Sequence, residues 1–432
     1  MVQFTPDDLL YRHFKKHPYI STDSRKVMPG SIFFALKGDH FDGNQYAGKA
    51  LEGGAAYAVI DHPEAYRNEF TLLVSNVLET LQTLATMHRN SLNIPVIAIT
   101  GSNGKTTTKE LMAAALGTRF SVLATSGNLN NHIGVPLTLL SIRPEHEMAV
   151  IEMGANHRGE IAHLCRIARP THGLITNIGK AHLEGFGGIE GVVKAKNELY
   201  DHLRNNGGTV FVNADDPLLM KLSQNMHRIT YGQNQHASYQ GTLKTGTDQG
   251  LEINLNDDIQ IHTRLMGSYN FPNVMAAIAI ALHFRVEKAQ ATEALTEYEP
   301  RMNRSQLLHT TRNLLVLDAY NANPSSMEAA LHHFATMTGD HKILLLGDMF
   351  ELGASAAQEH DRILNLAMTL NVEQIYTAGP LFLQAAKMFP DVKAFGNTES
   401  LQKQLSSERL TDKTILIKGS RGMKMEQLLD QL

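Results

Sequence analysis

The feature that most constrains this chain is an alternation of short apolar strands with longer helical patterns. Near-continuous apolar runs at 96–100, 148–154 and 172–179 each precede a segment with helical periodicity. Strands that are apolar at almost every position are typical of a parallel sheet whose two faces are both covered by helices. We therefore expect an α/β fold with a parallel sheet in the central part of the chain.

The same alternation occurs on both sides of this central part. Further strand-like runs lie at 31–36, 55–60, 314–320, 342–348, 374–379 and 414–420. At roughly 150 residues per domain, a chain of 432 residues corresponds to about three domains. We predict three α/β domains with bounds at 1–90, 91–302 and 303–432. The segment 241–265 differs, because polar and apolar residues alternate there between turn signals, as in an antiparallel hairpin.

Composition and charge exclude several classes of function. The formal net charge is -4, so the chain lacks the basic surplus that is typical of proteins that bind nucleic acid. Cys165 is the single cysteine, which rules out an intramolecular disulfide, and its apolar neighbours predict a buried structural thiol. No apolar run reaches about 18 residues and the N-terminus lacks a signal-peptide pattern. We therefore expect a cytoplasmic protein without a membrane span.

A glycine-rich loop lies between the strand at 96–100 and a helical pattern. The common phosphate-binding loop, G-x-x-x-x-G-K-[ST], requires glycine where this chain has Ile99, so the loop here is shorter. A strand, a glycine loop and a helix N-terminus together direct backbone N–H groups and the helix dipole towards an anion. The predicted nucleotide-binding residues are Gly101, Ser102, Asn103, Gly104, Lys105, Thr106 and Thr107. We therefore predict a central P-loop ATPase domain, with Lys105 on the β- and γ-phosphates and a threonine hydroxyl on Mg²⁺.

Polar side chains also stand where two other central strands end. Glu152 lies at the end of one strand, Asn177 at the end of another, and His182 just after it. Ligands of open parallel sheets bind beyond the carboxyl ends of the strands, so Glu152 and His182 are candidate Mg²⁺ ligands. Taken alone, a helix cap or ion pair for Glu152 and a loop histidine for His182 are the simpler interpretations. Lys196, which has no obvious partner in its helix, would by itself be read as solvent-exposed.

Seven motifs, in this order, resemble the Mur ligases of bacterial peptidoglycan synthesis over nearly the whole chain. They are TGSNGKTTTKE at 100–110, EMGAN at 152–156, NIGKAHLEGFG at 177–187, VVKAKNELY at 192–200, DAYNANPSSMEAA at 318–330, LLGDMFELG at 345–353 and IKGSRGMKME at 417–426. The segment 22–43 is similar to the uridine-diphosphate-binding domain of this family. The runs 318–330 and 345–353 resemble the family member that adds a D-alanyl-D-alanine dipeptide.

The resemblance implies an activity and a role for each domain. ATP would phosphorylate the terminal carboxylate of UDP-N-acetylmuramoyl-tripeptide, and the amine of D-alanyl-D-alanine would attack the acyl phosphate to form an amide. Residues 1–90 would bind the UDP-linked substrate, 91–302 would bind ATP, and 303–432 would form a Rossmann-like domain that binds the dipeptide. ATP and two Mg²⁺ ions are the implied cofactors, and a monomer is expected.

The resemblance also implies roles for the residues of the catalytic centre. The implied catalytic residues are Lys105, His182, Lys196 and Arg304. Thr106 and Glu152 would hold one Mg²⁺. His182 and a CO₂-derived carbamate on Lys196 would hold the other, since carbamylation replaces a cation by the oxygen ligands that Mg²⁺ prefers.

The remaining implied residues bind the substrates. Asn270 and Asn273 would contact adenine, Arg304 the γ-phosphate and Asp318 the ribose of ATP. The residues implied for D-alanyl-D-alanine are Tyr320, Asn321, Asn323 and Ser326. The candidates for the uridine nucleotide are Ser24, Arg25, Lys37 and Gly38.

Other interpretations stay open on the sequence. One is a sibling enzyme, either a folylpolyglutamate synthase or the ligase that adds the third amino acid, which is expected to carry a D-N-P-R run. Here Asn323-Pro324 is followed by serines instead. The others are a P-loop kinase or NTPase without ligase activity and a non-catalytic ATP-binding protein. The last is opposed by four intact residues, Lys105, Glu152, His182 and Lys196. Dependence of ATP turnover on D-alanyl-D-alanine would separate the ligase from both.

Overall fold

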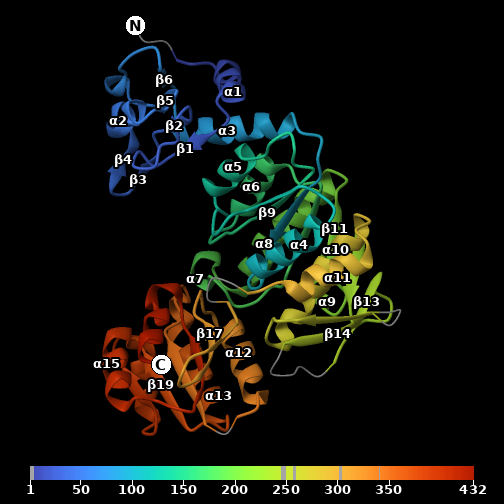
Figure 1. Cartoon of the computed structure of the whole chain (residues 1–432), viewed down its shortest axis with the longest axis vertical. Helices are drawn as coiled ribbons and strands as arrows, with labels where there is room; N and C mark the ends of the chain where they lie inside the picture. The colour runs from blue at the N-terminus through green and yellow to red at the C-terminus, as the bar shows by residue number, and fades with distance from the viewer. Residues whose placement is uncertain (1–3, 245–249, 256–258, 301–303, 340) are drawn as a thin grey trace.

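The computed structural model describes residues 4–244, 250–255, 259–300, 304–339 and 341–432. These residues form three α/β domains along the long axis of the molecule, with the first and third at opposite ends and the second between them (Figure 1). The predicted α/β fold class with parallel sheets is therefore confirmed. The bound predicted between residues 302 and 303 lies outside the described residues.

The first domain is built on a small parallel sheet with the strand order β1–β2–β5–β6. Its elements are α1 (Asp7–Lys16), β1 (Ile20–Ser21), β2 (Ile32–Phe34), the hairpin β3 (Lys37–Gly38) and β4 (Phe41–Asp42), α2 (Ala47–Glu52), β5 (Tyr57–Ile60) and β6 (Thr71–Leu73). Successive side chains of a strand point to opposite faces. Phe33 accordingly packs with α2, and Phe34 packs in the core that includes α1.

Helix α3 (Val77–Asn90) connects the first and second domains. Its buried face packs against α5 (Gly134–Leu140) and α6 (Glu160–Ala168) of the second domain. The buried Arg89 guanidinium donates a hydrogen bond from Nε to the carbonyl of Ala168 at 3.0 Å. Because α3 is fixed to the second domain in this way, it holds the first domain in place above it (Figure 1).

The second domain contains a sheet with the order β15–β14–β13–β12–β11–β10–β7–β9–β8. Its strands are β7 (Val96–Thr100), β8 (Val122–Ala124), β9 (Met148–Glu152), β10 (His172–Ile175), β11 (Thr209–Asn213), β12 (His227–Gly232), β13 (Tyr239–Leu243), β14 (Leu251–Leu255) and β15 (Ile259–Thr263). Pairing is parallel from β8 to β13 and antiparallel from β13 to β15. The antiparallel hairpin predicted at 241–265 is thus confirmed, except at 245–249 and 256–258, which lie outside the described residues.

Helices cover both faces of this sheet, as the apolar strands predict. Alternate residues of β7 divide between two cores: Ile97 and Ile99 in one, Val96 and Ala98 in the other. The helices of the first core are α4 (Lys105–Gly117), α10 (Phe271–His283) and α11 (Lys288–Glu297). The helices on the opposite face include α5, α6 and α8 (Ile189–Asn205). The carboxyl ends of β7, β9 and β10 are therefore left to line a site.

The third domain has a sheet with the order β16–β17–β21–β18–β19–β20, in which β16 is an antiparallel edge strand. Its strands are β16 (Gln306–His309), β17 (Leu314–Asp318), β18 (Lys342–Gly347), β19 (Gln374–Ala378), β20 (Lys393–Phe395) and β21 (Thr414–Lys418). Its α-helices are α12 (Pro324–Thr336), α13 (Ala356–Met368), α14 (Pro380–Ala385) and α15 (Thr398–Glu408). The apolar runs predicted in this part of the chain form the parallel strands β17, β18, β19 and β21, whereas β20, also parallel, was not predicted.

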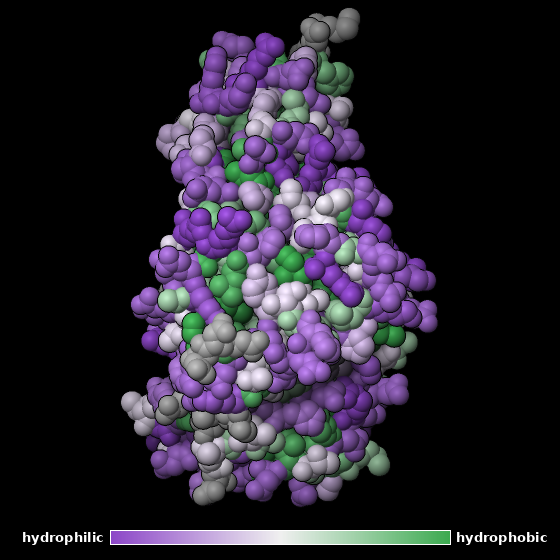
Figure 2. Space-filling view, turned by 90° about the vertical axis from the view of Figure 1, so that its right-hand side faces the viewer, coloured by the Kyte–Doolittle hydropathy of each residue, from purple (hydrophilic) through white to green (hydrophobic). Residues whose placement is uncertain are grey.

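The surface is that of an ordinary globular protein. On the face drawn in Figure 2, polar residues predominate and apolar ones are scattered among them. Scattered apolar residues are normal on protein surfaces. Among the described residues, no helix combines the length and the apolar character that a membrane crossing requires.

Asp348, in the motif 345–353, holds together the loops at the carboxyl edge of the third sheet. The fully buried carboxylate accepts the backbone N–H groups of Leu381 and Phe382 at the start of α14, both at 2.9 Å. Beside it, the buried imidazole of His360 accepts the N–H of Met349 through Nε2 and faces the Ala356 carbonyl through Nδ1. Burial lowers the pKa of His360, so this imidazole is neutral. The motif is thereby shaped by buried hydrogen bonds.

Replacing Asp348 by alanine is expected to lower the free energy of unfolding by about 2–4 kcal/mol, because two buried N–H groups lose their acceptor. Urea unfolding of the full chain, followed by circular dichroism, measures this as a lower transition midpoint. Asp361→Ala removes an exposed carboxylate of the same domain and is expected to change stability by less than about 0.5 kcal/mol. Equal midpoints for the two variants would contradict the structural role of Asp348.

Candidate active site

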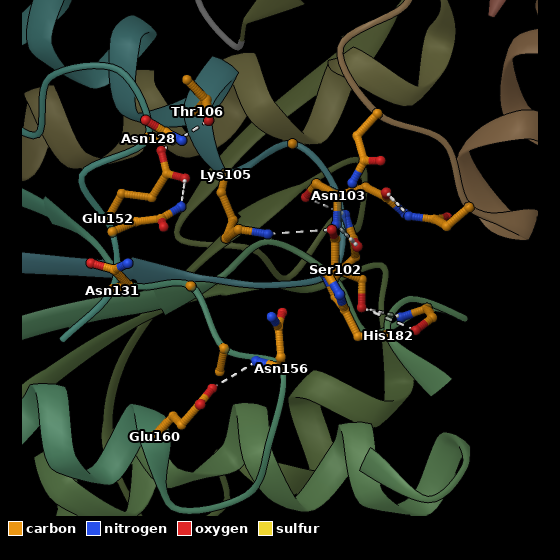
Figure 3. A pocket seen from close by; sticks show the side chains of 18 of the residues that line it. Ser102, Asn103, Lys105, Thr106, Asn128, Asn131, Glu152, Asn156, Glu160 and His182 are labelled. Carbon is orange, nitrogen blue, oxygen red and sulfur yellow. Dashed lines mark hydrogen bonds between the residues drawn. The ribbon is translucent and has the colours of Figure 1, made fainter. Parts of the chain in front are cut away.

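One large cavity lies where the three domains meet. Its volume is about 1260 Å³, and it is lined by the start of α3, by the glycine loop, by the ends of β9 and β10, and by the segment after β17. Residues that line it include Asn76 of the first domain, Glu152 of the second and Tyr320 of the third. Figure 3 shows the central part, with Thr106 and Glu152 side by side and Lys105 reaching towards the loop.

Two positions of the loop accept only glycine. Gly101 has a φ of +146°, and a Cβ built on it would lie 1.9 Å from the Thr176 hydroxyl oxygen. Gly104 has a φ of +78°, and a Cβ there would lie 2.7 Å from Oδ1 of Asn273. Both conformations are unfavourable for residues that carry a side chain. The short loop is therefore shaped by close contact with the segment after β10 and with α10.

Asn177 anchors this loop to the neighbouring strand. Its carbonyl accepts the Ser102 N–H and its Oδ1 accepts the Asn103 N–H, both at 3.0 Å. The Ser102 hydroxyl also donates to the carbonyl of Gly179 at 3.0 Å. The loop N–H groups of Ser102 and Asn103 are therefore engaged. The N–H groups in the first turn of α4 have no intrahelical acceptor, and they remain available to a phosphate.

Lys105 opens α4 and points back over the loop. Its Nζ donates to the Gly101 carbonyl at 2.7 Å. Burial lowers the pKa of Lys105; Glu152 opposes this shift and the charge of Arg304 adds to it. Lys105, Glu152 and Arg304 therefore lie close enough to interact, although Arg304 belongs to the segment that leads into the third domain.

The buried carboxylate of Glu152 is the centre of the candidate metal site. It accepts the Thr106 hydroxyl and the Asn130 amide, both at 2.9 Å, and the ammonium of buried Lys109 lies 3.9 Å away. Within the described ranges, no cluster of three or more His, Cys, Asp or Glu side chains could hold a metal ion. Mg²⁺ at phosphate sites is normally held by one or two carboxylates, waters and the phosphates themselves. Thr106 and Glu152 fit that donor set.

His182 and Lys196, the residues predicted to hold a second Mg²⁺, have other neighbours than Glu152. His182 precedes α7 (Leu183–Phe186), and its Nδ1 lies in close contact with the carboxylate of Glu351 of the third domain. Lys196 is only 1% exposed, so the sequence interpretation of a solvent-exposed lysine is wrong. Its Nζ lies 5.2 Å from the Phe186 ring centroid. Burial and the nearby charge of Lys105 lower the pKa of Lys196 to about 7.

The residues predicted to contact adenine and ribose are held by hydrogen bonds of their own. Asn270 donates to the Met266 carbonyl at 2.7 Å, and Asn273 donates to Oδ1 of Asn270 at 2.8 Å. Asp318 lies at the end of β17, where the buried Lys418 donates to it at 2.5 Å. All of them except Met266 line the cavity.

The run predicted to bind the dipeptide begins α12 and contacts the glycine loop. Asn323 and Ser326 form a reciprocal capping box at the helix N-terminus. The Asn323 amide also donates to Oδ1 of Asn103 at 2.7 Å, which joins the third domain to the second. Close by, Arg304 lies over the Tyr320 ring at 3.6 Å from its centroid. Tyr320, Asn321, Asn323 and Ser326 all line the cavity.

The four uridine candidates lie apart from these residues, at the carboxyl edge of the first sheet. Ser24 and Arg25 follow β1, and Lys37 and Gly38 form β3 after β2. Arg25 is exposed and pairs with Asp23 at 2.8 Å. None of these four is among the residues that line the cavity, although Asn76, from the same sheet edge, is.

Several residues that contact the predicted site residues were missed on the sequence. They are Lys109, Asn130, Glu351 and Lys418. The motifs at 100–110, 345–353 and 417–426 contain three of these, but a lysine or glutamate in a motif does not reveal its partner. Asn130 lies in a loop without regular periodicity, so no local pattern marks it.

Gly101→Ala is expected to weaken nucleotide binding by at least about 100-fold, because the new methyl group forces the loop away from Thr176. Titration with a fluorescent ADP analogue in the presence of Mg²⁺ measures the dissociation constant. Gly117→Ala, at the end of helix α4 and with open space around it, is the matched control and should bind like the wild type. Wild-type affinity of Gly101→Ala would contradict this account of the loop.

Comparisons with known proteins agree with the geometry. The Mur ligase middle domain matches residues 99–281, the Mur ligase glutamate ligase domain matches 303–421, and the catalytic domain of the Mur ligase family matches 18–116. A curated relative, the UDP-N-acetylmuramoyl-tripeptide–D-alanyl-D-alanine ligase of Bacillus subtilis (strain 168), is 35% identical over 96% of this chain and 92% of its own length.

Solved structures extend the likeness to the arrangement of all three domains. MurF from Acinetobacter baumannii superposes with a TM-score of 0.86 at 31% identity, covering 96% of this chain and 93% of that one. MurF ligase from Thermotoga maritima, in complex with ADP, gives a TM-score of 0.83 at 26% identity and covers 96% of each chain. The resemblance found in the motifs is thus confirmed: this chain belongs to the Mur ligase family.

Proposed function

We propose that this chain is an ATP-dependent ligase that joins D-alanyl-D-alanine to UDP-N-acetylmuramoyl-tripeptide in peptidoglycan precursor synthesis. One observation carries the proposal: the nucleotide loop and the predicted acceptor run meet in a single cavity, where Asn323 donates to Asn103 at 2.7 Å. An ATPase or kinase with an unrelated acceptor needs no such contact. The similarity to the Bacillus subtilis enzyme over nearly its full length supports the same substrates.

The reaction needs ATP because a carboxylate is a poor electrophile. Transfer of the γ-phosphoryl group to the tripeptide carboxylate gives an acyl phosphate, and the neutral dipeptide amine then attacks the carbonyl carbon and displaces phosphate. Lys105 and Arg304, which interact electrostatically, stabilise the negative charge on the transferring group. The convergence of three domains on the cavity would limit the access of water, which otherwise hydrolyses the acyl phosphate.

Mg²⁺ would neutralise charge on the phosphate oxygens of ATP. Thr106 and Glu152 are the residues proposed to hold it, since their oxygens already lie 2.9 Å apart. His182 and carbamylated Lys196 are proposed for a second ion. Lys196 suits carbamylation because a pKa of about 7 leaves much of its amine neutral, and neutral amines react with CO₂. The carbamate would also replace the repulsion between Lys196 and Lys105 by attraction.

The UDP-linked substrate is proposed to run from the first domain into the cavity. Its uridine nucleotide would lie at the carboxyl edge of the first sheet, near Ser24, Arg25, Lys37 and Gly38. Asn76 follows β6 at this edge and also lines the cavity, which supports a continuous path. One chain supplies all these parts, so we propose a monomer, and both nucleotide substrates are cytoplasmic compounds, which favours the cytoplasm.

Phosphate release from ATP should depend on UDP-N-acetylmuramoyl-tripeptide and D-alanyl-D-alanine together. The expected ligation product is detected by mass spectrometry, with other amino acids and dipeptides as competing acceptors. ATP turnover that does not depend on the acceptor would instead support an NTPase. Preferential ligation of a single amino acid over D-alanyl-D-alanine would support a sibling ligase.

Lys196→Ala is expected to lower kcat by at least about 1000-fold, because the proposed second Mg²⁺ loses its carbamate ligand. Short carboxylic acids such as acetate should partly restore activity by supplying the missing oxygen ligand. Lys194→Ala, two residues earlier on α8, serves as control and should keep wild-type kcat. A fully active Lys196→Ala enzyme would eliminate the carbamate proposal.

A further inference from the structure

The Tyr320 ring carries two guanidinium groups. Cζ of Arg304 lies 3.6 Å from the ring centroid, and Cζ of Arg421 lies 5.0 Å from the same centroid. Each contact is a favourable cation–π interaction, but two like charges around one ring repel each other. Such a pair is stabilised when anionic groups lie beside it. Arg421 belongs to the motif 417–426. The function proposed above assigns no role to its side chain.

Arg304 faces the nucleotide. It lines the cavity, and its charge acts on both Lys105 and Lys109. Its Nε is buried and has no hydrogen-bond partner within the described part of the chain. This guanidinium is therefore placed to bind the transferring phosphoryl group. An anionic group of the acceptor would need a different cation.

Arg421 is the cation that remains near Tyr320. It is exposed and begins a short 3₁₀ turn at Arg421–Met423, just after β21. No ion pair joins it to a carboxylate of the described residues, whereas Lys418 pairs with Asp318 and Lys180 pairs with Glu359. The structure thus offers a basic group, beside the predicted acceptor run, that lacks an anion.

We propose that Arg421 binds the C-terminal carboxylate of the dipeptide acceptor, so that the acceptor lies along Tyr320 with its amine towards Arg304. The proposal deepens the ligase function given above and rests on it. D-Alanyl-D-alanine has one carboxylate and one amine, and only the amine reacts. A bidentate guanidinium–carboxylate pair at Arg421 would keep the carboxylate away from the negative acyl phosphate and direct the amine to it.

The spacing suits a dipeptide. Since both cations lie over one ring, their Cζ atoms are within roughly 9 Å of each other, and an extended dipeptide spans about 7 Å. A single amino acid spans about half of that length, so a dipeptide is the better match to a separation near this upper limit. We therefore expect the two arginines around Tyr320 to favour a dipeptide over a single amino acid.

Steady-state kinetics with D-alanyl-D-alanine and its C-terminal amide test the proposal. Arg421→Ala is expected to lower kcat/KM for the dipeptide by about 10- to 100-fold, mainly through KM, with KM for ATP unchanged. The amide should be a similarly poor acceptor for the wild type. With Arg421→Ala, the two acceptors should be nearly equal, because the group that distinguishes them is gone. Arg421→Lys should lie between the wild type and Arg421→Ala.

Lys424→Ala is the matched control, since it removes an exposed cation of the same motif that, unlike Arg421, does not lie over the Tyr320 ring. It should retain the wild-type preference for the dipeptide over the amide. A wild-type preference in Arg421→Ala, or efficient ligation of D-alanine alone by the wild type, would overturn the inference while leaving the ligase function intact. A wild-type enzyme that ligates neither acceptor would overturn the proposed function, and this inference with it.

Discussion

The rest of the site depends on the contact between the glycine loop and the segment after β10. Gly101 lies so close to Thr176 that no side chain fits between them, and Asn177 accepts the N–H groups of the next two loop residues. This contact fixes where α4 begins and hence where Lys105 and Thr106 lie. Asn103 of the same loop accepts a hydrogen bond from Asn323, which connects the predicted acceptor run of the third domain to the glycine loop of the second.

Electrostatics give this arrangement its preference for anions. Lys105, Lys109 and Arg304 interact around Glu152, and Lys196 lies near Lys105 in a buried position. Cations that are kept from water and close together are unfavourable by themselves. Under the proposed function, phosphates and a carboxylate would relieve that cost when they bind, which would tie substrate binding to the stability of the junction between the domains. The pair of arginines at Tyr320 extends the same principle to the acceptor.

Much of the fold follows from local patterns. The strands β7, β9, β10, β17, β18, β19 and β21 are rich in buried apolar residues, and each was predicted. The strands β8, β11 and β12 were not identified, because half-buried residues or flanking polar ones weaken the apolar signal. The two-residue strand β1 is too short for any periodic pattern to detect. Its place is decided by pairing with β2 instead.

The sequence by itself determined the α/β class, the short phosphate loop and the family, because glycines, apolar periodicity and motif order are local properties. Only the tertiary structure decided the environments of the side chains. It buried Lys196, which its helix alone would expose, paired Lys418 with Asp318, and set Arg421 beside Tyr320. Partners that are distant in sequence meet because parallel strands end at one edge of a sheet, and burial and charge at that edge depend on every segment that arrives there.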